Sequence, residues 1–137
     1  MNDEELKRIL TSTRTIATVG LSSNPAKDSY SVAAYLKRQA YHMIPVNPTA
    51  TEILGEKVYP DLLAIPEKVD VVQIFRPSSD VPTIVEQAIQ IGAKVVWMQV
   101  GIAHPEAARM AEKAGLQVVM NLCMRVTHIR LIGPSSA

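Results

Sequence analysis

Five short runs of apolar residues recur along this chain of 137 residues. Between them lie segments whose apolar residues have helical spacing, or segments rich in turn residues. The runs cover residues 15–20, 42–47, 69–75, 94–100 and 117–120. Their many Val and Ile residues and their short lengths favour strands that are buried on both faces. Strands that alternate with helices form βαβ units. The sequence therefore predicts an α/β fold, a doubly wound parallel five-stranded sheet with helices on both faces.

The segments between these runs predict the helices. A short helix at residues 3–10 has acids in its first turn and is expected to cover one sheet edge. Further helices are expected from Ser29 to Ala40, from a cap at Ser78 or Ser79 to Gly92, from His104 to Ala114, and within residues 121–132. Pro45 is tolerated only if the second strand lies at an edge of the sheet or if the proline lies at the end of that strand.

Composition limits the function classes. Hydrophobic residues make up 47% and aromatic residues 4%, so one domain over residues 1–137 with an aliphatic core is expected. The net charge of +1 gives no long-range field for nucleic acid or an anionic membrane. Cys123 is the single cysteine, which excludes an internal disulfide and fits a reducing, cytoplasmic location. The longest apolar runs are much shorter than a membrane span of about 20 residues.

Ligands of open parallel sheets bind beyond the carboxyl ends of the strands. There the first loop, after Gly20, offers Ser22, Ser23 and Lys27 before a helix that begins near Ser29. A helix amino terminus with a lysine beside it predicts an anion site. Alternatively, Ser29 only caps the helix and Lys27 is solvated.

The third strand brings a second basic group to the same edge. Arg76 follows that strand and is held by Pro77, at a place where phosphate or substrate sits in such folds. A plain surface charge is the alternative. The two basic residues together favour an anionic ligand.

The second loop argues against ordinary dinucleotides. Proteins that hold NAD usually carry Asp or Glu at the end of the second strand, but this chain has Asn47 followed by Pro48. NADP would favour a basic residue nearby, and residues 49–51 offer none. The three-glycine dinucleotide fingerprint and the P-loop motif are both missing.

No catalytic or metal-binding constellation emerges from the residues. Cys123 is more simply a small core residue than a nucleophile, and His128 lies five positions along, which is not a helical i, i+4 pair. The three histidines and one cysteine form no spaced ligand cluster. We therefore expect no catalytic residue and no metal ligand.

The order of five motifs resembles the small stand-alone CoA-binding proteins, whose Rossmann-like domain is similar to the amino-terminal domain of the succinyl-CoA synthetase alpha subunit. The motifs are VGLSSNPAKDSYSVAAYL, YHMIPVNP, VDVVQIFRPS, VVWMQVGI and GLQVVMNLCMRVTH, which together span about residues 15–128. The resemblance implies a coenzyme A site formed by Gly20, Ser22, Ser23, Lys27, Ser29, Tyr30, Asn47, Pro48, Phe75, Arg76, Pro77, Gln99 and Gly101.

Within that implied site, the loop after Gly20 would hold the phosphate-bearing end and Asn47 and Pro48 would flank the nucleotide. Residues 75–77 would line the path of CoA, and residues 99–101 would lie along the pantetheine. Synthetase-like domains carry a basic residue after the second strand, where this chain has Thr49-Ala50-Thr51. Their domain with the phosphorylated histidine has no counterpart here, so synthetase chemistry is not expected.

Three functions follow as hypotheses. The first is an accessory module that binds CoA or acyl-CoA without turnover. The second is an enzyme acting on a CoA thioester with Cys123 or His128 near the thiol end. The third is a nucleotide-sensing regulatory module that signals through a homodimer or an unknown protein partner. An apolar first helix and an exposed region around Trp97 would favour a dimer. Alternatively, Trp97 belongs to the core.

Overall fold

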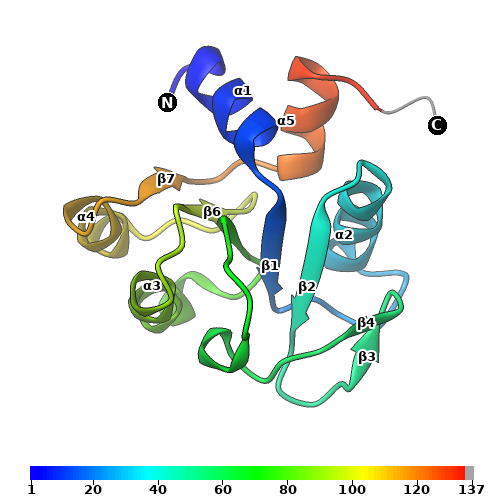
Figure 1. Cartoon of the computed structure of the whole chain (residues 1–137). Coiled ribbons are helices and arrows are strands. Elements are labelled where there is room, and N and C mark those ends of the chain that lie inside the picture. Colours follow the sequence, from blue (N-terminus) through cyan, green and yellow to red (C-terminus); the bar gives the residue numbers. More distant parts are fainter. Residues whose placement is uncertain (135–137) are drawn as a thin grey trace.

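A computed structural model of the chain describes residues 1–134. Its main sheet has five parallel strands in the order β2-β1-β5-β6-β7 (Figure 1). Their bounds are β1 Thr15–Val19, β2 His42–Val46, β5 Val71–Ile74, β6 Val95–Met98 and β7 Gln117–Val119. The predicted fold class is confirmed.

Helices cover both faces of the sheet. On one face lie α3 (Val81–Gln90) and α4 (Pro105–Lys113), and on the other α1 (Asp3–Ser12), α2 (Asp28–Arg38) and α5 (Met124–Leu131) (Figure 1). A small hairpin of β3 (Glu52–Ile53) and β4 (Glu56–Lys57) follows β2. Two 3₁₀ turns, η1 (Leu62–Ala64) and η2 (Ser78–Asp80), complete the elements within residues 1–134.

Each face of the sheet has its own aliphatic cluster. Alternate residues of one strand point to opposite faces, so Val96 and Met98 pack under α3 and α4 while Val95 and Trp97 pack under α1 and α5. Trp97 is fully buried, and its indole N–H donates to the carbonyl of Leu122 at 2.9 Å. The expectation of an exposed Trp97 that could support a dimer is therefore wrong.

Edge strand β2 tolerates its proline because the sheet continues on one side only. β2 pairs with β1, and residue Pro45 lies in its middle. On the outer side, Tyr59 N–H donates to the carbonyl of Pro45 and Asn47 N–H donates to the carbonyl of Tyr59. The edge position predicted from Pro45 is confirmed.

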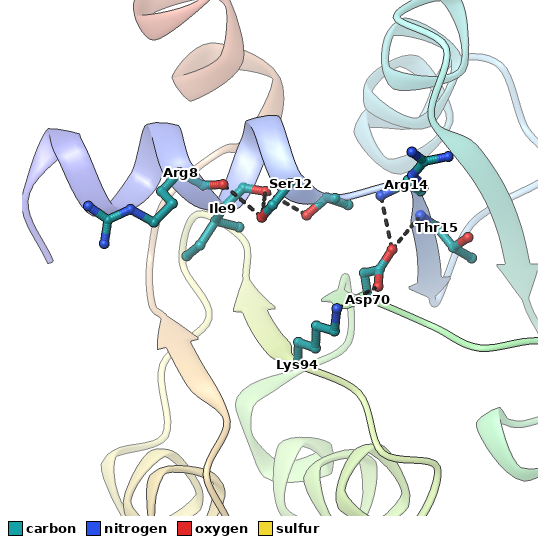
Figure 2. A network of polar contacts seen from close by, with 8 residues as sticks. Arg8, Ile9, Ser12, Arg14, Thr15, Asp70 and Lys94 are labelled. Atoms are coloured by element: carbon teal, nitrogen blue, oxygen red, sulfur yellow. Dashed lines mark hydrogen bonds and ion pairs between the residues drawn. The ribbon is translucent and has the colours of Figure 1, made fainter.

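Asp70 organises the amino ends of three neighbouring strands (Figure 2). One carboxylate oxygen accepts the backbone N–H groups of Arg14 and Thr15 at 2.9 and 3.1 Å, and Lys94 lies 3.7 Å from the other oxygen. Burial raises the pKa of Asp70, but these N–H donors and the nearby lysines outweigh it, so the pKa is lowered from its ordinary value. This anchor lies at the end of the sheet opposite the expected ligand site.

Some boundaries differ from the sequence prediction. α1 packs beside α5, and its buried residues join the cluster on that face, so it does not cover a sheet edge (Figure 1). Neither Ser78 nor Ser79 caps α3, because residues 78–80 form η2 and α3 begins at Val81. The hydroxyl of Ser78 accepts the N–H of Ala103 instead, at 3.2 Å.

Candidate functional site

Gly20 allows β1 to end against the strand beside it. Its φ is +86°, and a Cβ at this position would lie 2.8 Å from the carbonyl oxygen of Phe75 and 2.9 Å from Cδ of Arg76. Real Cβ atoms do not approach a backbone atom this closely, and positive φ also disfavours other residues. The single glycine of this loop therefore serves the contact between the ends of β1 and β5.

The loop between Gly20 and α2 is held by its own hydrogen bonds. Ser22 N–H donates to the hydroxyl of Ser29 at 3.0 Å, and Asn24 N–H donates to the hydroxyl of Ser22 at 3.0 Å. Lys27 N–H donates to the carbonyl of Asn24. α2 begins at Asp28 and has no side-chain cap, so Ser29 does not cap this helix. Ser29 is buried, and its hydroxyl holds the loop instead. The Lys27 side chain is exposed.

The Asn47 side chain joins the first and second loops. Its Nδ2 donates to the carbonyl of Leu21 at 3.0 Å, and its Oδ1 accepts the N–H groups of Thr49 and Ala50. A carboxylate at this position would lack the donor for Leu21. The amide that replaces the usual acid of dinucleotide-binding proteins thus has a structural role here.

Arg76 lies at the end of β5 and is paired with an acid. Its Nε and Nη2 donate to one carboxylate oxygen of Asp80 at 3.1 and 2.8 Å. Both side chains remain about half exposed, 52% and 43%, so water screens the pair. An anionic ligand can therefore replace part of the contact between Arg76 and Asp80 at a small cost in free energy.

The ends of β1 and β2 and the start of α3 enclose a hollow of about 430 Å³. We call it the first hollow. Gly20, Asn47, Pro48 and Arg76 of the predicted set line it, together with Val19, Val46, Pro60, Asp61, Leu62, Ser79, Asp80, Thr83, Ile84 and Gln87. Its wall is largely apolar near Leu62 and Ile84 and polar near Arg76.

A second hollow, of about 210 Å³, lies between the starts of α2 and α5. Phe75 and Gln99 of the predicted set line it, with Asp28, Val32, Val100, Cys123 and Arg125. Phe75 lines this hollow and its neighbour Arg76 lines the first, so the end of β5 separates the two.

Seven predicted residues line neither hollow: Ser22, Ser23, Lys27, Ser29, Tyr30, Pro77 and Gly101. Tyr30 packs partly against the cluster under α2, and Pro77 precedes η2. Gly101 N–H donates to the side chain of Asn121 at 2.7 Å. The predicted set is thus one edge of the sheet rather than one cavity.

His128 lies away from this edge, which corrects the expectation that it stands near a thiol end. It is 4% exposed, its Nδ1 is hydrogen-bonded to the hydroxyl of Tyr35 at 2.8 Å, and it borders a hollow beside Thr13, Arg14 and His42 at the amino ends of the strands. Burial lowers its pKa below the ordinary value. Cys123 is partly buried in the second hollow, and the two side chains do not meet.

The described residues show neither a metal cluster nor a membrane span. Within residues 1–134, no three His, Cys, Asp or Glu side chains gather as metal ligands. Among the helices of that same part, none is long and apolar enough to cross a membrane.

The sequence profile of a family described as "CoA binding domain" matches residues 14–129, most of the chain and all of the edge described above. The chain belongs to this family. It is 39% identical over 124 residues to the uncharacterized protein YneT of Bacillus subtilis, covering 90% of this chain and 92% of YneT.

Similar proteins include chains of this size and a much longer one. A structure titled hypothetical protein from Pyrococcus horikoshii OT3 superposes with a TM-score of 0.95 at 44% identity, covering 97% of this chain and 94% of that one. The ADP-forming acetate–CoA ligase II of Archaeoglobus fulgidus is 34% identical over 127 residues, covering 90% of this chain but only 18% of the ligase. The family fold therefore occurs both as a chain of this size and as a small part of a ligase.

Family motifs did not reveal the acidic and cationic residues of the two hollows. Asp80 follows Arg76 by four positions, and this spacing was the available signal for the ion pair. Asp28 and Arg125 reach the second hollow from the starts of α2 and α5, which no local pattern indicates.

Proposed function

We propose that this chain binds coenzyme A or an acyl-CoA along the carboxyl edge of its sheet and performs no chemical step of its own. The nucleotide lies in the first hollow, the phosphates lie beside Arg76 and the Gly20–Ser29 loop, and the pantetheine arm passes Phe75 to the second hollow. The observation that carries this proposal is the first hollow, with an apolar wall and Arg76 at its rim.

The chemistry of CoA matches the residues at this edge. CoA is an ADP derivative with a long uncharged arm, so it needs an apolar surface for adenine, cations or N–H donors for phosphate, and a path for the arm. Pro48, Leu62 and Ile84 offer the apolar surface, and Arg76 and Lys27 offer the cations. Membership of the CoA binding domain family supports the same ligand.

Asn47 supports CoA over NAD. In dinucleotide-binding proteins a carboxylate at this strand end accepts the ribose hydroxyls, whereas the Asn47 amide is engaged with Leu21, Thr49 and Ala50. The chain thus has no acid at this position to hold the ribose of NAD.

Titration calorimetry with CoA, acetyl-CoA, ADP, NAD and NADP tests this proposal. We expect CoA or acetyl-CoA to bind most tightly, ADP more weakly because it lacks the arm, and NAD and NADP weakest. Tighter binding of NAD than of CoA would overturn the proposal.

Cys123 favours a second candidate, an enzyme acting on a CoA thioester, because its thiol borders the second hollow. None of the histidines in residues 1–134 lines that hollow, so the thiol has no imidazole base there. Incubation of acetyl-CoA with the protein and with Cys123→Ser distinguishes the candidates. Release of free CoA that the substitution abolishes would establish the enzyme.

A further inference from the structure

A third hollow, of about 440 Å³, lies at the amino ends of the strands, opposite the edge proposed for CoA. It borders the carboxyl ends of α1, α2 and α5, and its polar wall includes Arg14, His42 and His128. Within residues 1–134 no acidic side chain lines it, whereas Asp80 lines the first hollow and Asp28 the second. A basic wall without an acid favours an anionic ligand.

Arg14 offers this hollow a guanidinium that no acid holds. Its backbone N–H donates to Asp70 at 2.9 Å, but Figure 2 shows its side chain pointing away from that carboxylate. None of the ion pairs within residues 1–134 involves Arg14, whereas His42 is paired with Glu67. An oxyanion can therefore contact the Arg14 guanidinium without displacing a partner.

The buried His128 ring presents a hydrogen-bond donor to the same hollow. Its Nδ1 lies 2.8 Å from the hydroxyl of Tyr35, which is 7% exposed and has no other hydrogen-bond partner within residues 1–134. If Nδ1 carried the ring proton, the hydroxyl hydrogen of Tyr35 would be buried without an acceptor. The Tyr35 O–H therefore donates to Nδ1, and the neutral His128 ring carries its proton on Nε2.

The Nε2–H group of His128 has no acceptor in the part of the chain that the structure describes. There, every fully enclosed side-chain nitrogen or oxygen has a hydrogen-bond partner, whereas Nε2 of His128 has none. Nε2 is therefore not enclosed, and it opens into the hollow that His128 lines. The rings of Tyr35 and Tyr41 contact the imidazole edge-on, with centroids 5.5 and 5.8 Å away. The donor is thus held in place before a ligand binds.

The helix ends beside the third hollow carry a partial negative charge, which by itself disfavours an anion. Their carbonyl groups are already paired, however. The carbonyl of Leu10 accepts the hydroxyl of Tyr41 at 2.6 Å, and the carbonyl of Ile9 accepts the hydroxyl of Thr13 at 2.7 Å. At the end of α2, the carbonyl of Leu36 accepts two backbone N–H groups at 3.0 and 3.4 Å. These pairings weaken the opposition of the helix ends to an anion.

We propose that the third hollow binds a small organic anion whose oxygen atoms accept from Nε2–H of His128 and from the guanidinium of Arg14. The apolar part of this ligand lies against Leu10, Tyr41 and Ile132, which line the same hollow. A carboxylate and a phosphate both offer such oxygen atoms, so the two share this chemistry. The site goes beyond the proposed function, because it lies at the other end of the sheet and does not require CoA.

Titration with benzoate and with phenyl phosphate, followed by NMR of the His128 ring at about pH 7.5, tests this site. The two probes share an apolar ring and differ in the anionic group. We expect the His128 ring signals to shift, and Arg14→Gln to weaken the binding measured from this shift by about tenfold. The probe that binds more tightly identifies the anionic group that the hollow prefers. Signals of His128 that neither probe shifts would overturn the proposal.

Arg8→Gln is the matched control, because Arg8 is exposed on α1 (Figure 2) and loses the same charge outside the third hollow. This variant should bind both probes as the unmodified protein does. Equal affinities of Arg14→Gln and Arg8→Gln would overturn the proposal. Failure of the protein to bind CoA would overturn the proposed function and leave this site standing.

A second measurement needs no substitution. In nitrogen-15 spectra of the ligand-free protein, Nε2 of the His128 ring should carry the proton and Nδ1 should not. Addition of benzoate or phenyl phosphate should then move the Nε2 signal more than the Nδ1 signal. A proton on Nδ1 would overturn the proposal, because Nε2 would then face the anion with a lone pair.

Discussion

Gly20 and Asn47 hold the carboxyl edge of the sheet together. Gly20 meets the backbone of Phe75, and Asn47 joins the loops that follow β1 and β2. Arg76 lies beside Gly20, so the close approach at Gly20 also places the guanidinium at the rim of the first hollow. At the scale of single residues, the site depends on one glycine, one amide and one cation.

Gly20→Ala should lower the free energy of unfolding by about 1–3 kcal/mol, because it adds backbone strain and a clash with the Phe75 carbonyl. Urea denaturation measures this. The matched control is Gly92→Ala, where φ is +73° but nothing lies within 4 Å of the added Cβ. Equal losses for the two variants would show that the close approach to β5 contributes nothing.

Arg76→Ala should weaken CoA binding by about 1–3 kcal/mol, or roughly 5- to 150-fold, because it removes a charge-assisted contact with phosphate. Asp80→Asn should not weaken binding, because it frees Arg76 from its acid. Calorimetry with CoA measures both, and Arg8→Ala on the exposed side of α1 (Figure 2) is the control. An unchanged affinity of Arg76→Ala would place the phosphates elsewhere.

At the scale of elements, α5 separates the two residues once considered for catalysis. Cys123 precedes its first turn at the second hollow, while His128 lies farther along, near the amino ends of the strands. Each helical residue advances about 1.5 Å along the axis, so the five positions from Cys123 to His128 carry the chain about 7.5 Å, into the last turn of this short helix. His128 then packs between the rings of Tyr35 and Tyr41 and attaches α5 to α2.

This contact should make stability depend on pH. Burial lowers the folded pKa of His128 below 6.5, so the unfolded chain binds the proton first as the pH falls. The contribution of neutral His128 to the free energy of unfolding should therefore be at its maximum above about pH 6.5 and should decrease as the pH falls through the folded pKa. Urea denaturation across this pH range measures the free energy of unfolding. In the His128→Gln variant, this free energy should no longer decrease in the same way as the pH falls. A His128 ring that titrates at or above 6.5 by NMR would contradict the account.

The sequence predicted the sheet because its strands are short, mostly apolar runs rich in Val and Ile, a pattern that indicates burial without knowledge of the neighbouring elements. It missed β3 and β4, which have two residues each and are too short for a periodic pattern. It named Asn47 and Arg76 as site residues but not their contacts with Leu21 and Asp80. Such contacts depend on how loops distant in sequence meet, as does the division of the edge into two hollows.

For the whole molecule, the parallel sheet brings the ends of β1, β2, β5 and β6 to one edge, and Asp70 anchors the opposite ends. One long ligand can cross the end of β5 from the first hollow to the second. The same fold forms a chain of this size in YneT and a small part of acetate–CoA ligase II. The proposed binding of CoA fits a domain that occurs in both contexts.

A crystal structure of the protein with CoA tests the central claim most directly. We predict the adenine in the first hollow, the phosphates within hydrogen-bond distance of Arg76, and the pantetheine arm passing Phe75 to reach Gln99. A nucleotide bound at the amino ends of the strands, or an arm directed away from the second hollow, would contradict it.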